Sequence, residues 1–143
     1  MSANILKTIV DRIAVDLGNI DASDGYNNTI LSTNIKKQFE SIDSAKSFPA
    51  IYIASARADR SRQTDQVTYD VPVTVEVFGY VKKMNDTLEE AMNLAADMEK
   101  AIYADETLNG NVWGLSLTFE VASMDEFGVV LMTLSATANY FKT

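Results

Sequence analysis

Three arginines stand close together in an otherwise acidic chain: Arg57, Arg60 and Arg62. They belong to a polar stretch, residues 57–66, that has no apolar periodicity and therefore predicts a loop or a hairpin tip. A guanidinium group pairs with a carboxylate through two parallel hydrogen bonds, so arginines are favoured where acidic surfaces are recognised. The cluster is either a solvated loop tip or a contact patch for an acidic surface on a neighbouring subunit or partner.

Few other residues could support catalysis. The chain contains no histidine and no cysteine, which excludes Ser-His and Cys-His arrangements, thiolate nucleophiles and zinc–thiolate sites. Ser41 or Ser44 could pair with Lys46, but the spacing matches no catalytic motif. Glu89 and Glu90 are neighbours on a predicted helix and so do not face each other. We therefore expect no enzyme; the alternative, a small carboxylate-based hydrolase or ligand-binding domain, lacks a recognisable pair of titratable groups.

Residues 21–25 have the composition of a calcium loop but not its pattern. If Gly25 is placed at the sixth loop position, Ile20 and Leu31 occupy the first and last positions, where carboxylates are required. The segment therefore predicts a plain turn. The sequence also lacks a phosphate-binding glycine loop, so we expect no cofactor and no metal ion.

Length and charge narrow the class of protein. The 143 residues suit one domain, residues 1–143, and 47% of them are hydrophobic, as in an ordinary globular protein. The formal net charge of −8 disfavours static binding to nucleic acid, because that affinity comes largely from Lys and Arg on phosphates. The chain begins without a signal-peptide pattern and has no apolar run long enough to span a bilayer, so we expect a soluble protein made in the cytoplasm.

Two amphipathic helices are predicted. Residues 4–17 carry an apolar stripe at helical spacing and end at Gly18; the stripe consists of Ile5, Leu6, Ile9, Val10, Ile13 and Leu17. Residues 86–103 carry a second stripe, and the spacing of Asp86 and Glu89 is typical of a capping arrangement. The second stripe consists of Leu88, Ala91, Met92, Ala95, Met98 and Ile102.

Strict alternation of apolar and polar residues predicts the strands. It is clearest over residues 67–81, where only Pro72 interrupts it and indicates an edge position, a bulge or a bend. If this strand were straight, it would be about 50 Å long, whereas a domain of this size is about 40 Å across. The strand should therefore extend beyond the rest of the domain, or bend. Further strands are predicted at residues 50–56, 113–121 and 130–140, with a short one near 29–35 and an ambiguous stretch at 36–47. Trp113 and most of the methionines lie on apolar stripes and are expected in the core: Met84, Met92, Met98, Met124 and Met132.

The predicted order is one helix, about three strands, a second helix and a final hairpin. Helices that are segregated from one largely antiparallel sheet describe an α/β domain of the α+β type. We therefore expect a sheet of about four to five strands with both helices packed on one face. Loops or turns join these elements, at residues 18–28, around 109–110 and at 124–128.

The order and spacing of these segments resemble the tail terminator, or tail completion, proteins of tailed phages, the group that includes the lambda-type protein U. The resemblance rests on the first helix, a Gly25-Tyr26 turn, the Phe48-Pro49-Ala50-Ile51 strand entry and the long alternating strand that ends at Val81. It continues through residues 88–103, the acidic turn Asp105-Glu106 and the terminal Asn139-Tyr140-Phe141. The ambiguous residues 36–47 depart from the pattern.

This resemblance implies a virion protein whose homo-hexameric ring caps the tail tube protein, stops tail growth and offers a surface to neck or connector proteins. DNA would pass through the lumen without tight binding, and we expect the lumen to be net negative, with Asp105, Glu106 and Asp125 as candidates because they lie in predicted turns. Another neck component, such as a head-closure or connector protein, is the alternative within the same class. No membrane is involved in either reading.

Overall fold

The computed structural model describes residues 5–38, 48–59, 68–83 and 85–141. It contains two helices, α1 (Ile5–Leu17) and α2 (Thr87–Tyr103), and five strands. The strands are β1 (Ile35–Lys36), β2 (Ala50–Ala58), β3 (Thr68–Lys82), β4 (Val112–Met124) and β5 (Phe127–Phe141). The predicted order of elements is therefore confirmed.

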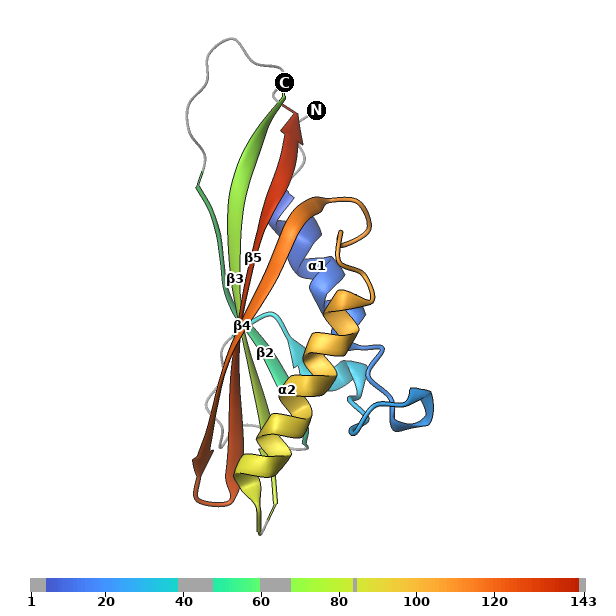
Figure 1. Ribbon diagram of the computed structural model, residues 1–143, viewed down its shortest axis with the longest axis vertical. Coiled ribbons are helices and arrows are strands. Elements are labelled where there is room, and N and C mark those ends of the chain that lie inside the picture. The colour runs from blue at the N-terminus through green and yellow to red at the C-terminus, as the bar shows by residue number, and fades with distance from the viewer. Residues whose placement is uncertain (1–4, 39–47, 60–67, 84, 142–143) are drawn as a thin grey trace.

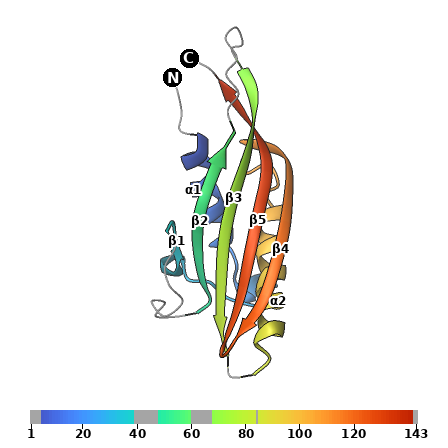
Figure 2. The same cartoon turned by 90° about the vertical axis from the view of Figure 1, so that its left-hand side faces the viewer.

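The five strands form one sheet in the order β1-β2-β3-β5-β4. Only the short β1 runs parallel to its neighbour β2; all other pairs are antiparallel. Both helices lie on the same face of the sheet, α1 behind β1 and β2 and α2 behind β5 and β4 (Figures 1 and 2). The expected α+β class, with two helices on one face, is confirmed, and neither of the described helices lies on the other face of the sheet, which is called the helix-free face below.

The core lies between the helices and the sheet, and the alternation of the strands explains which residues enter it. In β3, Val71, Val73, Val75 and Val77 are buried on the helix side, and β5 contributes every second residue from Val130 to Ala138. From α1 the buried members are Ile5, Ile9, Ile13 and Leu17, as its stripe predicts. Alternation along β3 and β5 and the helical period of α1 therefore place the core correctly.

The predicted stripe of α2 is partly wrong. Leu88 and Met92 are 45% and 49% exposed, whereas Leu94 and Ala101 are buried. The buried side of the helix is thus rotated towards α1, and one flank of α2 keeps large apolar side chains in solvent. The predicted cap is also wrong, because Asp86 has a left-handed backbone (φ 58°) and its side chain makes no capping hydrogen bond.

Pro72 does not lie on an edge strand, and no bulge marks its place. The β3–β5 register runs without interruption through the Pro72–Thr137 pair, so the bulge among the expected alternatives is wrong. The Pro72 carbonyl accepts a hydrogen bond from the Asp59 N–H, which shows that its backbone faces β2 rather than β5. Because β2 ends at Ala58, the missing N–H of Pro72 falls where the β2–β3 ladder stops.

A bulge in β4 reverses the expected position of Trp113. Its register shifts between Trp113 and Ser116, where Gly114 has a left-handed backbone (φ 65°). Val112 is therefore buried, whereas Trp113 turns to the helix-free side and is 50% exposed. Among the methionines that the structure describes, Met98 and Met132 are core residues as predicted, while Met92 and Met124 are exposed.

Two smaller expectations need correction. The short strand expected near residues 29–35 is only the two-residue β1 (Ile35–Lys36), which a 3-10 turn (Ser32–Asn34) precedes. The polar stretch expected from residue 57 as a loop still belongs to β2 at Arg57 and Ala58, where it pairs with Thr74 and Val73. The predicted turn at residues 21–25 is confirmed, with the Asp21 carboxylate accepting the Ser23 N–H.

The central strands extend beyond their neighbours, as the length of β3 predicts. The β3–β5 ladder continues to the Thr68–Phe141 pair, but β2 ends opposite Val73 and β4 begins opposite Ala138. Residues 68–70 and 139–141 therefore form a two-stranded end that projects past both helices (Figure 1).

Candidate functional site

Arg57 is the only member of the predicted arginine cluster that the structure describes, because Arg60 and Arg62 lie outside the described residues. It projects from β2 on the helix-free side of the sheet, where its side chain is 72% exposed and its Nε lies 3.8 Å from Asp59 Oδ1. Such an exposed ion pair contributes little to folding, so the guanidinium is available for an outside partner. Ser41, Ser44 and Lys46 also lie outside the described residues.

The helix-free face of the sheet divides into an aromatic part and a polar part. Near the β3–α2 end, Tyr52 and Tyr80 are buried side by side, 5.6 Å between ring centroids, with Phe48 and Phe78 packed around them. Towards the two-stranded end the same face carries the half-exposed Trp113 among small polar and charged side chains: Ser55, Arg57, Thr74, Glu76, Ser116 and Thr118. A flat, solvent-facing surface of this kind is suited to contact with another surface rather than to enclosing a substrate.

Both margins of the sheet have open strand edges within the part of the chain that the structure describes. β4 is the last strand on its side, and no described strand pairs with its outer edge over 13 residues. On the other side β1 pairs with β2 only at Ile51 and Tyr52, which leaves Ile53–Ala58 without a described strand on that edge; this stretch contains a bulge between Ile53 and Ser55. Open edges present unpaired N–H and C=O groups to any chain that approaches.

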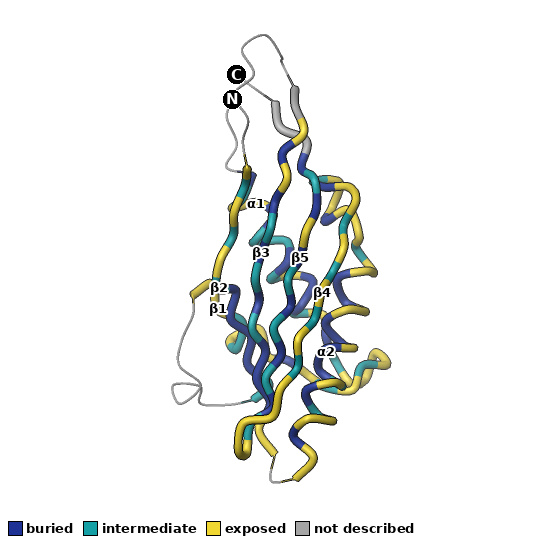
Figure 3. Tube along the Cα trace, turned by 60° about the vertical axis from the view of Figure 1, so that its left-hand side comes forward, coloured by how far each residue is buried: buried dark blue, intermediate teal, exposed yellow. Residues whose placement is uncertain are grey.

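The margin formed by β4 is also unusually apolar. Its helix-side residues Leu115, Leu117, Phe119 and Val121 are only half-buried, although they pack against the core (Figure 3). The exposed Leu88 and Met92 of α2 face the same margin. Asp97 points towards the loop that follows α1, where it binds Asn27, and Leu88 lies on the opposite side of the helix, because nine residues at about 3.6 per turn amount to two and a half turns. Sequence patterning missed this margin, since it placed Leu88 and Met92 on the buried stripe of the predicted helix.

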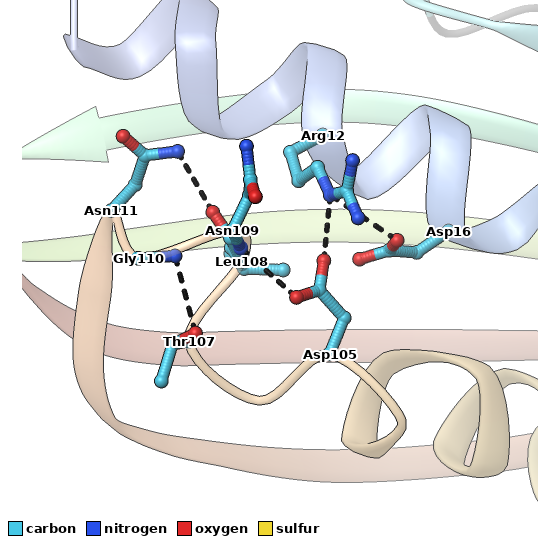
Figure 4. Close-up of polar contacts among 8 residues, drawn as sticks. All are labelled: Arg12, Asp16, Asp105, Thr107, Leu108, Asn109, Gly110 and Asn111. Carbon is cyan, nitrogen blue, oxygen red and sulfur yellow. Dashed lines mark hydrogen bonds and ion pairs between the residues drawn. The ribbon is translucent and has the colours of Figure 1, made fainter.

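One partly buried polar cluster joins α1 to the loop between α2 and β4 (Figure 4). The Nε of Arg12 lies 2.6 Å from Asp105 Oδ2 and 3.5 Å from Asp16 Oδ1. Asp16 is 2% exposed, and its Oδ2 makes no hydrogen bond to any described group. Burial, together with the nearby Asp105 carboxylate, outweighs the attraction of Arg12 and raises the pKa of Asp16 to about 7.

Asp105 behaves in the opposite way. Burial alone would raise its pKa, but Asp16, the Arg12 guanidinium and the Asn109 N–H together lower the pKa of Asp105 below its usual range. Its carboxylate is therefore engaged inside the protein and does not serve as the free acidic group expected of a lumen residue. Glu106 and Asp125, the other two lumen candidates, are exposed.

A second buried carboxylate, which sequence reasoning missed, holds the loop that follows α1. Asp97 is 2% exposed and accepts hydrogen bonds from the Asn27 N–H (2.8 Å), the Asn28 N–H (2.8 Å) and Asn28 Nδ2 (2.9 Å). Its sequence signal is an aspartate between the buried Leu94 and Ala101 on a helix. Because all three donors come from one loop, the Asp97 carboxylate holds that loop against α2 and is not free to act as a base on a substrate.

Together these carboxylates provide no recognisable reaction centre. Among the described residues, no group of three or more Asp or Glu is placed to hold a metal ion. The features that remain without an internal role are two open sheet edges, an apolar margin and an exposed arginine.

Within the described residues, no helix is long and apolar enough to cross a membrane. No protein-family model matches the chain, and no curated protein is significantly similar to it.

Proposed function

We propose that this chain is a structural virion subunit whose hexameric ring caps the tail tube of a phage, ends tail polymerisation and offers a surface for the neck. The observation that carries the proposal is the pair of open strand edges on opposite margins of one sheet. A subunit with two different open edges can join copies head to tail, and such contacts close into a ring when the rotation allows it. The similarity of segment order to tail terminators supplies the assignment to the tail.

The acidic composition supports a lumen that DNA leaves easily. Six copies carry a formal charge of −48 (6 × −8). Each phosphate neutralised by Lys or Arg adds affinity, so a channel that DNA must leave quickly benefits from having few such contacts. Exposed carboxylates such as Glu106 and Asp125 are suited to such a wall.

A tail-assembly assay tests the proposed function. Cells that make the phage without this protein should accumulate tails of abnormal length that do not join to heads, and supplying the protein should restore both. If tails instead keep their normal length and fail only to join heads, the protein is a head-closure or connector component. If assembly is normal without it, the proposal is wrong.

The arginines provide a sharper version of the same assay. We expect a triple change of Arg57, Arg60 and Arg62 to Ala to leave the protein folded but to reduce correct termination and head joining, because the acidic contacts on a neighbour or on the tube are lost. Circular dichroism and thermal unfolding check the fold, and electron microscopy of tails measures their length. A matched change of the exposed Lys82 and Lys83 to Ala should have no such effect. If the triple variant gives normal tails, the arginines make no contact that assembly requires and form only a solvated loop.

A further inference from the structure

We propose that copies of this chain join head to tail, with the open β4 edge of one copy pairing with the open Ile53–Ala58 edge of β2 in the next. This inference rests on the proposed ring and names the two surfaces that would build it. In this joint, the strand that pairs with each open edge comes from a second copy of the same chain.

The directions of the strands permit the joint. Because β2 is antiparallel to β3, β3 to β5 and β5 to β4, β2 and β4 run in opposite directions within one copy. Copies related by rotation about an axis roughly along the strands would therefore place β4 antiparallel to β2 of the next copy. The helices of every copy would remain on one face of a continuous sheet, and each copy would still have one β4 edge and one β2 edge to offer.

Charge is complementary across the joint. Arg57 is the only charged residue of β2, and Glu120 is the only charged residue of β4. Both project from the helix-free face, since Arg57 is level with Thr74 and Glu120 with Leu131. Leu131 pairs with Phe78, so the register that sets Arg57 opposite Glu120 offsets neighbouring copies by four residues along the strands, as in a ring whose strands tilt against its axis. Opposite charges on neighbouring strands stabilise a sheet, whereas a symmetric β4–β4 joint would bring two Glu120 side chains towards each other. Head-to-tail pairing is therefore favoured over a two-fold dimer.

Shape is complementary as well. On the helix side, the β4 margin carries large side chains that are only half-buried, and α2 adds the exposed Leu88 and Met92. Past its bulge, the open part of β2 carries alanines on this side instead, Ala56 and Ala58, which pair with the helix-side Val75 and Val73. Small side chains leave room for the bulky margin of the neighbour, and burial of that margin would stabilise the contact. Beyond its bulge at Trp113–Ser116, β4 also lacks Lys, Arg and Pro, residues that commonly protect an edge strand from pairing.

Cysteine crosslinking tests the joint cleanly, because the chain has no cysteine of its own. Ser55→Cys and Ala122→Cys place one thiol on each open edge, at exposed positions of the helix-free face that lie opposite each other when Arg57 faces Glu120. A short bismaleimide is applied to concentrated protein and to isolated tails. On a denaturing gel the double variant should give a ladder of crosslinked species that ends near 94 kDa (6 × 15.7), whereas each single variant should stay at 15.7 kDa. The matched control is Ser55→Cys with Ser135→Cys, which moves the second thiol to the interior strand β5 and should give no ladder.

The alternative outcomes are distinct. A crosslinked dimer from Ala122→Cys alone, or no ladder from the double variant in either preparation, would overturn the head-to-tail joint. Glu120→Arg should lower the yield of the ladder, by up to about fivefold per interface, and Arg57→Glu added to it should restore the yield. An unchanged ladder with Glu120→Arg alone would remove this charge pair from the joint.

The inference and the proposed function fail separately. Crosslinks between two β4 strands together with normal tail termination would overturn the head-to-tail joint alone. A head-to-tail ring formed by a protein whose loss leaves tail length and head joining normal would overturn the proposed function alone.

Discussion

Replacing Gly128 by alanine should destabilise the fold by about 3 kcal/mol, near the upper end of what overpacking a well-packed site costs. A Cβ at this position would lie 2.4 Å from the Thr87 carbonyl oxygen, 2.8 Å from Val81 Cγ2 and 3.0 Å from Ala91 Cβ. The nearest atom belongs to the backbone of the first turn of α2, so relief requires the helix to move away from β5. For a domain of this size the loss corresponds to a decrease in melting temperature of about 10 °C.

Gly110→Ala is the control for this prediction. Gly110 has a left-handed backbone (φ 83°) but no atom within 4 Å of the added Cβ. Its replacement therefore costs only backbone strain, on the order of 1 kcal/mol. Thermal and urea unfolding of both variants decide the matter: if Gly128→Ala costs no more than Gly110→Ala, α2 does not approach the β5 backbone as described.

The second large effect is a change in the pH dependence of stability on replacing Asp16 by Asn. The pKa of Asp16 is raised from 3.8 to about 7 in the folded protein, so the folded state holds a proton that the unfolded state has released. Stability contributed by this group is complete below about pH 4 and is lost as the pH rises to about 7. Asparagine stays neutral throughout, so the variant should equal the natural protein near pH 4 and exceed it at pH 8.

The expected gain at pH 8 is about 2 kcal/mol. A shift of three pKa units would correspond to about 4 kcal/mol, and the lowered pKa of Asp105 offsets part of it because the two carboxylates interact. Urea unfolding at pH 4.5, 6 and 8 measures the difference between the two proteins. Asp105→Asn is the control and should destabilise at pH 8, because Arg12 loses its closest acceptor. Equal stability differences at all three pH values for Asp16→Asn would contradict the assignment of the proton to Asp16.

Local patterns predicted most of the fold because each depends on one period. Alternation along residues 71–81 and 130–138 identifies two central strands and their buried sides, since both strands pack against helices on one face only. The helical stripe of α1 is equally faithful because its opposite face meets solvent. Neither pattern depends on knowing which strands are neighbours.

The errors arise where tertiary contacts or unusual backbone decide the outcome. Gly114 adds a residue to β4 and thereby turns Trp113 out of the core, and nothing in the alternation of residues 113–121 reveals that bulge. Leu88 and Met92 match a buried stripe, but α2 lies at the margin of the sheet, where no described element covers its outer flank. The apolar margin was thus misassigned to the core because periodicity reports an apolar face and not what covers it.

The buried carboxylates were missed for a related reason. Asp16 and Asp97 occupy apolar helix faces, where aspartate is expected only if partners are present. Those partners, Arg12 and Asp105 in one case and the amides of Asn27 and Asn28 in the other, include residues far away in the sequence. The available signal in the sequence was an acidic residue within an apolar stripe. Only the packing of α1, α2 and their loops shows which groups pair with that residue.

The most direct test of the proposed ring is a reconstruction of the head-proximal end of the tail in assembled particles. The proposal predicts six copies of this chain, about 94 kDa in total (6 × 15.7), in a closed ring on the last layer of the tube, around a channel whose wall is net negative. A trimer, an isolated monomer, a position elsewhere in the particle, or a channel lined by Lys and Arg would contradict it.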